Sequence, residues 1–305
     1  MSQVSIILCT YQGEAFLKAQ LQSILDQSHF NWKLYISDDG SKDETQRIIK
    51  SFKPLLKKGS ITHWRGSHEG FAKHFIKTTS RIQKKSPYYA WCDQDDIWHK
   101  DKLKAAVAWL KKQPKTKPAL YCGRTFLINE QDKIIGMSPL FLKPKTFQNA
   151  LVQNIAGGNT MLFNEAARQL LIPFKNKQIV VHDWLLYLIV SAVGGVIHYD
   201  HKPYVFYRQH RQNLIGHQQD IKAKVSRLNR LFKGDFKVWF STHNTLINTL
   251  ESQLTPKNKK TWQSFISLRN KSFIERLVLL KRSKIYRQSI LGHLGLYLAA
   301  CFNKL

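Results

Sequence analysis

Short apolar runs alternate with stretches of helical periodicity over about the first hundred residues. Each apolar run has the length of a buried strand and ends at polar or glycine residues, which predicts a strand followed by a turn. The predicted strands span residues 4–9, 32–37, 60–64 and 88–92. The segments that begin near Glu14, Asp43 and Phe71 repeat apolar residues every three or four positions, which predicts helices. This alternation predicts an α/β fold with a doubly wound sheet.

A polar cluster follows the carboxyl end of each predicted strand. The clusters are Thr10-Tyr11, Asp38-Asp39, Arg65-Gly66 and Asp93-Gln94-Asp95-Asp96. Ligands of doubly wound sheets bind beyond the carboxyl ends of the strands, so we expect the clusters to converge on one crevice. A tyrosine ring can stack on a base, and a carboxylate can accept hydrogen bonds from ribose hydroxyls. The clusters together predict a site for a nucleoside diphosphate.

Asp93, Asp95 and Asp96 place three carboxylates within four residues. Such charges repel one another unless a cation or water shares their oxygens. Alternate residues of an extended segment point the same way, so Asp93 and Asp95 could hold one divalent ion that neutralises a diphosphate. The tetrapeptide alone favours another interpretation, a solvated acidic turn with an aspartate capping the next helix. The chain has no GxGxxG or GxxxxGK[ST] motif, which argues against a dinucleotide dehydrogenase or a P-loop enzyme.

Several ordered segments of the chain resemble the family 2 glycosyltransferases. They are residues 5–14, 37–41, 70–75 and 93–98, and the resemblance extends over about residues 4–216. It is strongest to bacterial enzymes that build surface polysaccharides, often described as rhamnosyltransferases. The resemblance implies a GT-A fold, a mixed sheet flanked by helices, and an inverting transfer of a hexose or deoxyhexose from a UDP- or dTDP-sugar. It also implies Mg²⁺ or Mn²⁺ and a saccharide acceptor, which we expect to be lipid-linked, in the biosynthesis of lipopolysaccharide O-antigen or capsule.

The resemblance assigns the nucleotide contacts to residues near the first two strands. Thr10, Tyr11 and Glu14 would hold the nucleoside end of the donor. Asp39, with Asp38 as an additional candidate, would contact the base or the ribose.

The acidic tetrapeptide would lie at the reacting end of the donor. Asp93 and Asp95 would flank the sugar nucleotide and the metal, with Asp96 as a substitute ligand. The chain departs from the family at Gln12 and His74, where the family usually has asparagine. We interpret His74 as a helix-packing residue.

The middle of the chain is predicted to supply the acceptor side. Residues 119–123 and 125–128 are typical of strands, and the Gly157-Gly158 turn leads into another apolar strand, similar to the acceptor-side loop of the family. Asp183 lies between apolar runs, and its simplest interpretation is the N-cap of a helix over 184–192. The resemblance instead favours Asp183 as the catalytic base that takes a proton from the acceptor hydroxyl. The neighbouring His182 is the second candidate for this base, although packing or orientation is its favoured role.

Residues 201–210 are interpreted as a strand followed by a basic cluster. A Tyr-Arg-Gln-His stretch lies near the diphosphate in the resembling enzymes, which implies that Arg208 and His210 hold phosphate oxygens or the metal. The alternative interpretation is an ordinary solvated basic loop.

The composition is strongly basic, with 48 Lys and Arg residues against 20 Asp and Glu residues and a formal charge of +28. This charge predicts a polyanionic neighbour, such as phosphate-bearing substrates, an anionic membrane face or nucleic acid. A nucleic-acid-binding protein is the alternative function, but no zinc-finger spacing or aromatic RNP pattern supports it, and we expect no nucleic-acid partner. Cys9, Cys92 and Cys122 lie in apolar runs outside any CxxC pair, and no signal peptide is expected, so we predict a cytoplasmic protein with reduced thiols.

The character of the chain changes near residue 217. Residues 1–216 are predicted to form the catalytic domain, and residues 217–305 a basic helical region with 17 Lys and Arg residues against 4 Asp and Glu residues. The segment 285–302 is apolar but too short and interrupted to span a bilayer. It could lie in the interface of the inner face of the cell membrane, where Lys281, Arg282 and nearby basic residues would meet anionic lipid. The alternative is a helix that docks on the core, and the sequence leaves both open.

Overall fold

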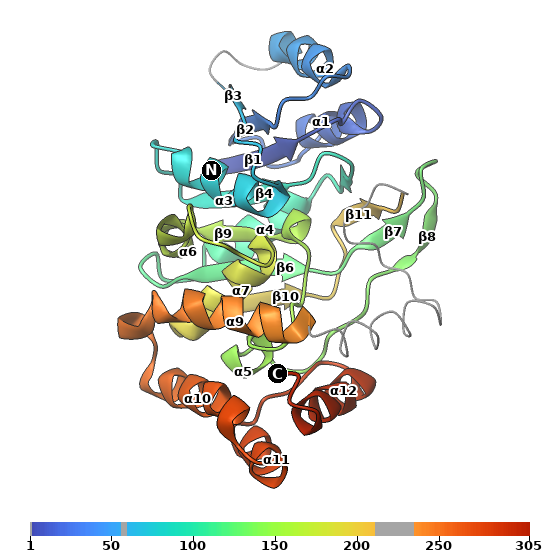
Figure 1. The fold of residues 1–305 in the computed structure, drawn as a ribbon. Coiled ribbons are helices and arrows are strands. Elements are labelled where there is room, and N and C mark those ends of the chain that lie inside the picture. The colour runs from blue at the N-terminus through green and yellow to red at the C-terminus, as the bar shows by residue number, and fades with distance from the viewer. Residues whose placement is uncertain (1, 56–59, 211–234) are drawn as a thin grey trace.

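A seven-stranded mixed sheet forms the centre of the protein (Figure 1). The computed structural model describes residues 2–55, 60–210 and 235–305. The strand order across the sheet is β10-β6-β9-β4-β1-β2-β3. The strands are β1 (Val4–Thr10), β2 (Trp32–Asp38), β3 (Ile61–Arg65), β4 (Tyr88–Cys92), β6 (Ala119–Gly123), β9 (Leu162–Asn164) and β10 (Val196–Asp200).

Neighbouring strands in the N-terminal part of this sheet run parallel. β1 pairs in parallel with β2 and β4, and β2 pairs in parallel with β3. β9 runs antiparallel to β4 and β6, which makes the sheet mixed. The predicted α/β fold and its first four strands are therefore confirmed. Because the parallel strands end at one edge of the sheet, the polar clusters that follow them lie at that same edge.

Every residue of β1 is buried, because helices cover both faces of the sheet. Alternate residues point to opposite faces, and Ile6 and Ile7 accordingly lie in two different hydrophobic clusters. The cluster around Ile6 includes apolar residues of α1 (Leu17–Leu25) and α4 (Lys102–Leu110). The cluster around Ile7 includes residues of α3 (Phe71–Arg81) and α7 (His182–Ala192).

A smaller sheet lies beside the carboxyl end of β4. Its strand order is β5-β11-β7-β8, with β5 (Ile97–Trp98), β7 (Phe126–Ile128), β8 (Ile134–Met137) and β11 (Val205–Arg208). β11 runs antiparallel to β5, the strand that follows the acidic tetrapeptide directly. This pairing brings the end of β11 beside Asp95, although more than a hundred residues separate the two along the chain.

The remaining helices of residues 2–210 cover the sheet and shape its carboxyl edge. They are α2 (Thr45–Phe52), η1 (Lys53–Leu55), α5 (Phe147–Ala150), η2 (Gly158–Thr160), α6 (Glu165–Leu171) and η3 (Ile172–Phe174). All residues of α7 are buried. α7 begins at His182, two residues earlier than predicted, and Val181 is its N-cap. The interpretation of Asp183 as the N-cap is therefore wrong, and its carboxylate lies within the first turn.

The C-terminal residues form helices that gather beyond the β10 edge of the sheet, at the end of the molecule opposite α2 (Figure 1). They are α9 (Asp235–Asn248), η4 (Glu251–Gln253), α10 (Pro256–Ser267), η5 (Leu268–Asn270), α11 (Phe273–Arg282) and α12 (Ile290–Cys301). Leu246, Leu250, Phe265 and Leu268 are buried in the same cluster as α7, whereas Phe273 is half exposed. The predicted boundary at 216/217 lies outside the described residues and stays a prediction. In the part of the chain that the structure describes, no helix has the length and apolarity needed to cross a membrane.

Candidate active site

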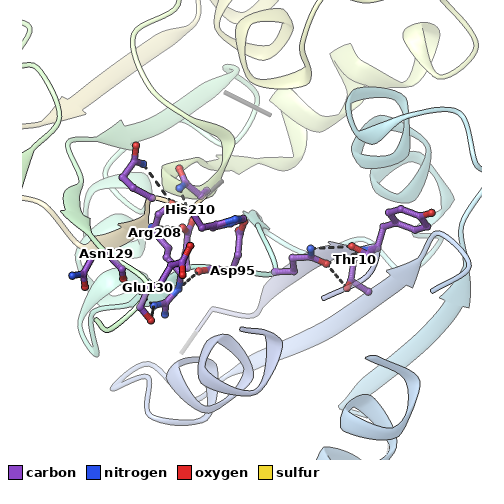
Figure 2. A network of polar contacts seen from close by, with 11 residues as sticks. Thr10, Asp95, Asn129, Glu130, Arg208 and His210 are labelled. Atoms are coloured by element: carbon purple, nitrogen blue, oxygen red, sulfur yellow. Dashed lines mark hydrogen bonds and ion pairs between the residues drawn. The ribbon is translucent and has the colours of Figure 1, made fainter. Parts of the chain in front are cut away.

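Gln94 connects the carboxyl ends of β1 and β4. Its side-chain oxygen accepts hydrogen bonds from Thr10 Oγ1 (2.6 Å) and from Tyr11 N (2.8 Å), and its side-chain nitrogen donates to Tyr11 O (3.0 Å). Figure 2 shows this contact at Thr10, in the same network of polar contacts as Asp95. The Tyr11 side chain remains 56% exposed, so its ring is accessible to a ligand. The sequence analysis gave Gln94 no role, because a glutamine between aspartates carries no signal of a partner so distant along the chain.

Glu14 joins the loop after β1 to the start of α2. Its carboxylate accepts a hydrogen bond from Glu44 N (3.0 Å), at the N-terminus of α2, and its own backbone N–H donates to Asp43 Oδ2 (3.0 Å). Gln12 acts similarly, because its side-chain oxygen accepts from Lys42 N (2.9 Å). These contacts stabilise the loop, so the predicted nucleoside contact of Glu14 would require its carboxylate to leave a helix N-terminus.

The neighbouring residues Asp38 and Asp39 have different surroundings. Asp38 is buried, and its carboxylate accepts hydrogen bonds from Ser41 N (3.0 Å), Gly40 N (3.2 Å) and the Gln46 side chain, which makes it the centre of a turn. Asp39 Oδ1 accepts from His68 N (2.7 Å). Of the two, Asp39 is the better candidate for a ligand contact because Asp38 is occupied by its own turn.

Carboxylates from two distant parts of the chain meet at the carboxyl end of β4. Burial, together with the nearby charges of Asp95 and Asp183, raises the pKa of Asp93 to about 8. Asp93 is therefore close to both Asp95 and Asp183. α4 begins at Lys102 and its N-cap is Asp101, so no aspartate of the tetrapeptide caps this helix.

Lys102 lies behind the acidic tetrapeptide. Its ammonium is buried 3.4 Å from the centroid of the Trp98 ring, and burial lowers its pKa to about 7. Asp93 and Asp96 act in the opposite direction on this pKa. Because its pKa is lowered, Lys102 offsets the charge of these carboxylates only in part.

Asp96 faces the protein interior. Its side chain is fully buried and accepts hydrogen bonds from Asn159 Nδ2 (2.6 Å) and from Arg208 N (3.1 Å). These contacts tie the tetrapeptide to η2 and to β11. Both oxygens of the Asp96 carboxylate thus have partners within the protein, which favours a positioning role, and its predicted role as a substitute metal ligand stays a prediction.

His210 lies directly beside Asp95, with His210 Nε2 2.8 Å from Asp95 Oδ2 (Figure 2). Its ring also contacts the ring of Phe16, with 5.1 Å between centroids. The two predicted site residues thus meet across the junction of β4 and β11, and each carries a group that can ligate a metal.

Arg208 is 1% exposed and holds the backbone around this pair (Figure 2). Its guanidinium donates to the carbonyl oxygens of Asp95 (2.9 Å), Asn129 (3.2 Å) and Glu130 (3.3 Å), and it pairs with the carboxylate of Asp132. A phosphate could reach the guanidinium only if these contacts broke. These contacts favour a role of Arg208 in positioning Asp95, and its predicted contact with phosphate stays a prediction.

The side chains near Asp95 suit a divalent cation whose remaining ligands would come from a diphosphate. Among residues 2–55, 60–210 and 235–305, no group of three or more His, Cys, Asp and Glu side chains is arranged as a metal site. Asp95 and His210 nevertheless offer a carboxylate and an imidazole side by side, next to the partly buried Asp93. Mg²⁺ and Mn²⁺ commonly take few protein ligands and complete their shell with phosphate oxygens and water. The residues fit such a shared site and do not form an all-protein cage.

Asp183 lies at the N-terminus of α7, close to the Gly157-Gly158 turn. Its carboxylate accepts hydrogen bonds from Trp184 N (2.6 Å), Gly158 N (3.2 Å) and the Asn154 side chain. Burial raises its pKa to about 6, while these hydrogen bonds act in the opposite direction. The group is thus mainly ionised at neutral pH and still basic enough to accept a proton.

His182 is enclosed by aromatic rings. It stacks on Phe75 with 4.2 Å between centroids and contacts the edge of Trp91 at 4.8 Å. Burial lowers its pKa to about 3, so the ring is neutral and a poor proton acceptor. The second-ranked role of His182 as the base is therefore disfavoured, and packing under the Gly158 turn is the role that the geometry supports.

A mixed sheet flanked by helices, with carboxylates at the ends of its parallel strands, is the arrangement expected of the GT-A fold. The sequence matches the family described as "Glycosyl transferase family 2" over residues 5–171, so the chain belongs to this family. The resemblance inferred from the motifs is thereby confirmed. Membership of this family gives no support to the alternative of a nucleic-acid-binding protein.

Two curated relatives and two solved structures illustrate the similarity. The chain is 29% identical to dTDP-rhamnosyl transferase RfbG of Shigella flexneri over 243 residues, which cover 72% of this chain and 78% of the relative. It is 28% identical over 194 residues to the Escherichia coli enzyme UDP-Glc:alpha-D-GlcNAc-diphosphoundecaprenol beta-1,3-glucosyltransferase WfgD, covering 63% and 71% of the two chains.

The solved structures share the fold at low sequence identity. The structure of TarS residues 1–349 of S. aureus, in complex with UDP-GlcNAc, superposes with a TM-score of 0.53 at 13% identity. The match covers 99% of this chain and 89% of that 349-residue fragment. The mannosyltransferase PcManGT of Pyrobaculum calidifontis, in complex with GDP-Man and Mn²⁺, gives a TM-score of 0.50 at 15% identity, with coverage of 99% and 86%.

Proposed function

We propose that the protein transfers a hexose or deoxyhexose from a UDP- or dTDP-sugar to a saccharide acceptor, with inversion, in the biosynthesis of a cell-surface polysaccharide. The observation that carries the proposal is that Asp95 lies beside His210 and that Asp93 is close enough to both Asp95 and Asp183 for their charges to raise its pKa. The names of the relatives support the donor class, because RfbG is a dTDP-rhamnosyl transferase and WfgD uses UDP-Glc.

The donor nucleotide would lie along the carboxyl ends of β1 and β2. The exposed ring of Tyr11 is available to stack on the base, and Asp39 would contact the ribose or the base. Gln94 holds Thr10 and Tyr11 in a fixed relation to Asp93 and Asp95, so it sets the distance between the nucleoside and the diphosphate. Thr10 and Gln94 are positioning residues in this proposal.

Asp95 and His210 would hold Mg²⁺ or Mn²⁺, and Asp93 would lie beside the sugar diphosphate. A bound divalent cation supplies the charge that stabilises the departing diphosphate. Arg208 keeps the Asp95 backbone in place through its hydrogen bond to the Asp95 carbonyl, and Asp96 keeps β11 in register with the acidic tetrapeptide.

Asp183 would act as the base. The acceptor hydroxyl oxygen forms a bond to the anomeric carbon while the bond from that carbon to the diphosphate oxygen breaks, and the hydroxyl proton passes to the Asp183 carboxylate. A single displacement of this kind inverts the anomeric configuration. The hydrogen bonds from Gly158 N and Trp184 N orient the carboxylate toward one direction of approach.

The acceptor that we propose is a lipid-linked saccharide. The name of WfgD supports this class, since that enzyme acts on a GlcNAc-diphosphoundecaprenol. Transfer to such an acceptor would take place at the cytoplasmic face of the cell membrane, with the protein bound peripherally.

The experiment is a screen of radiolabelled UDP- and dTDP-sugars with lipid-linked acceptors, followed by determination of the anomeric configuration of the product by NMR. Asp183→Asn should lower kcat by about 10²- to 10⁴-fold, the usual contribution of a general base. Asp26→Asn is a matched control, because Asp26 is exposed and accepts a hydrogen bond only from Gln22 on the same helix among the bonds described. Unimpaired transfer by the Asp183 variant, or a product with retained configuration, would refute the proposal.

A further inference from the structure

α12 has two apolar faces. One face packs on the core through Leu296, Ala299 and Ala300. The other is a stripe of exposed side chains along the outer side of the helix and its C-cap: Ile290, Leu291, Leu294, Leu298 and Phe302. No Asp, Glu, Lys or Arg occurs in residues 290–301. The outer face of a helix on a soluble protein is normally polar, so this face lacks the residues that would suit it to water.

α11 extends the same feature. Phe273, Ile274 and Val278 are exposed on one side of α11, and Ile274 is 70% exposed. The two helices pack against each other, with Arg276 donating to the carbonyl oxygen of Cys301 (3.2 Å). Both lie at the end of the molecule farthest from β3 (Figure 1). We call these eight exposed apolar residues of α11, α12 and its C-cap the α11–α12 surface.

Basic residues accompany the α11–α12 surface. Residues 271–305 contain seven Lys or Arg residues and one acidic residue, Glu275. Lys281 and Arg282, in the last turn of α11, and Lys284, in the connection to α12, are exposed. A surface that combines exposed apolar side chains with cationic groups is complementary to an anionic lipid bilayer. A symmetric contact with a second copy of the chain would bring the same cationic groups together, which is unfavourable.

We propose that the α11–α12 surface docks the protein on an anionic membrane, with the two helices lying in the headgroup region. The inference rests on the proposed function in one respect: docking would bring the enzyme to a lipid-linked acceptor. The Leu and Ile side chains of α12 enter the boundary of the acyl chains, and the Lys and Arg side chains at the end of α11 and in the connection to α12 meet lipid phosphates.

The test is flotation of the full chain with vesicles of phosphatidylcholine alone and of phosphatidylcholine mixed with phosphatidylglycerol. The variant Leu291→Asp/Leu294→Asp removes apolar contacts where the side chains are 73% and 56% exposed. The control Phe30→Asp/Ile134→Asp adds the same charge at positions that are 72% and 56% exposed, in the loop before β2 and in β8. We expect the first variant to bind the anionic vesicles roughly tenfold or more weakly than the control, because only it places charge in the acyl boundary.

A second variant, Lys281→Gln/Arg282→Gln/Lys284→Gln, tests the contribution of the cationic side chains. It should bind the mixed vesicles more weakly than the wild-type chain but still bind them, because the exposed apolar side chains remain. No binding of the wild-type chain to anionic vesicles, equal binding to neutral vesicles, or equal binding of the two Asp double variants would each overturn the proposal. A wild-type dimer in light scattering that Leu291→Asp/Leu294→Asp converts to a monomer would overturn it in favour of a second copy of the chain.

The docking surface can fail independently of the enzymatic proposal. Release of nucleoside diphosphate with a soluble acceptor analogue should be unchanged in Leu291→Asp/Leu294→Asp, because these residues lie on α12 and outside the carboxylate pocket. If this variant loses vesicle binding and keeps the soluble reaction, both proposals stand. If the wild-type chain catalyses the soluble reaction and does not bind vesicles, the docking proposal and the peripheral location are refuted, and the proposed sugar transfer stands.

Discussion

Gly158 lies where a side chain cannot be placed without moving the candidate base or its neighbour. A Cβ at this position would overlap Nε2 of His182 and lie 3.2 Å from its Cδ2. His182 cannot retreat easily, because Phe75 and Trp91 enclose its ring. The alternative is a shift of the Gly157-Gly158 backbone, which would lengthen the hydrogen bond from Gly158 N to Asp183. Gly158→Ala therefore disturbs both the packing and the orientation of Asp183.

The magnitude follows from these two contacts. Inserting a methyl group into a well-packed core costs about 1–3 kcal/mol, and a weakened hydrogen bond to a charged group costs about 1.5–3 kcal/mol when it is lost completely. We expect the free energy of unfolding in urea to fall by about 1–3 kcal/mol in Gly158→Ala. The two costs do not add, because either the His182 ring or the Gly157-Gly158 backbone moves to make room for the methyl group. Turnover should fall as well, since the base is displaced.

Gly295 provides the matched control. It lies inside α12, and a Cβ there would meet no atom within 4 Å, so Gly295→Ala should raise the free energy of unfolding by about 0.5–1 kcal/mol. The His182→Ala background tests the cause, because the cost of Gly158→Ala should shrink when the ring is absent. A Gly158→Ala enzyme with unchanged stability and turnover, or a cost that is independent of His182, would refute the reasoning.

Three further predictions concern the pocket. The logarithm of kcat/KM should fall with a slope near one as the pH drops below about 6. Burial raises the pKa of Asp183 to about 6, and only the ionised carboxylate accepts a proton. A profile that is flat down to about pH 4.5 would contradict this prediction. Gln94→Ala should raise the KM for the donor about tenfold, since it breaks three hydrogen bonds that fix Thr10 and Tyr11, and unchanged donor kinetics would argue against the bridge. His182→Phe should keep kcat within a few-fold, because the ring packs among Phe75 and Trp91 as a neutral group; a loss as large as that of Asp183→Asn would make His182 the base.

The local features of this fold could be read from sequence, and the long-range ones could not. β1 and β4 are short apolar runs that end in polar residues, so their position and the convergence of the polar clusters follow from periodicity and the rules of parallel sheets. The partner of Asp95 is different, because His210 reaches it only through the antiparallel pairing of β11 with β5. No local sequence pattern predicts that pairing of strands.

The sequence also could not show which carboxylates make structural hydrogen bonds and which are candidates for ligand contacts. Asp38 and Asp39 are adjacent and chemically identical, yet one is the centre of a turn and the other faces the loop at His68. Asp95 and Asp96 likewise differ only in the direction of their side chains, and Asp96 points toward Asn159. Such differences depend on which backbone N–H groups the fold brings near each carboxylate, and those groups come from other segments.

The most direct test of the account separates Asp95 from Asp183 in one pair of measurements. Calorimetry with Mn²⁺ and UDP or dTDP measures nucleotide binding, and the radiolabelled assay measures sugar transfer. The account predicts that Asp95→Asn weakens metal-dependent nucleotide binding and lowers transfer with it, whereas Asp183→Asn binds the nucleotide like the wild-type chain and loses transfer alone. Equal effects of the two variants on both measurements, or full metal-dependent binding by Asp95→Asn, would contradict the claim that one pocket holds a cation at Asp95 and a base at Asp183.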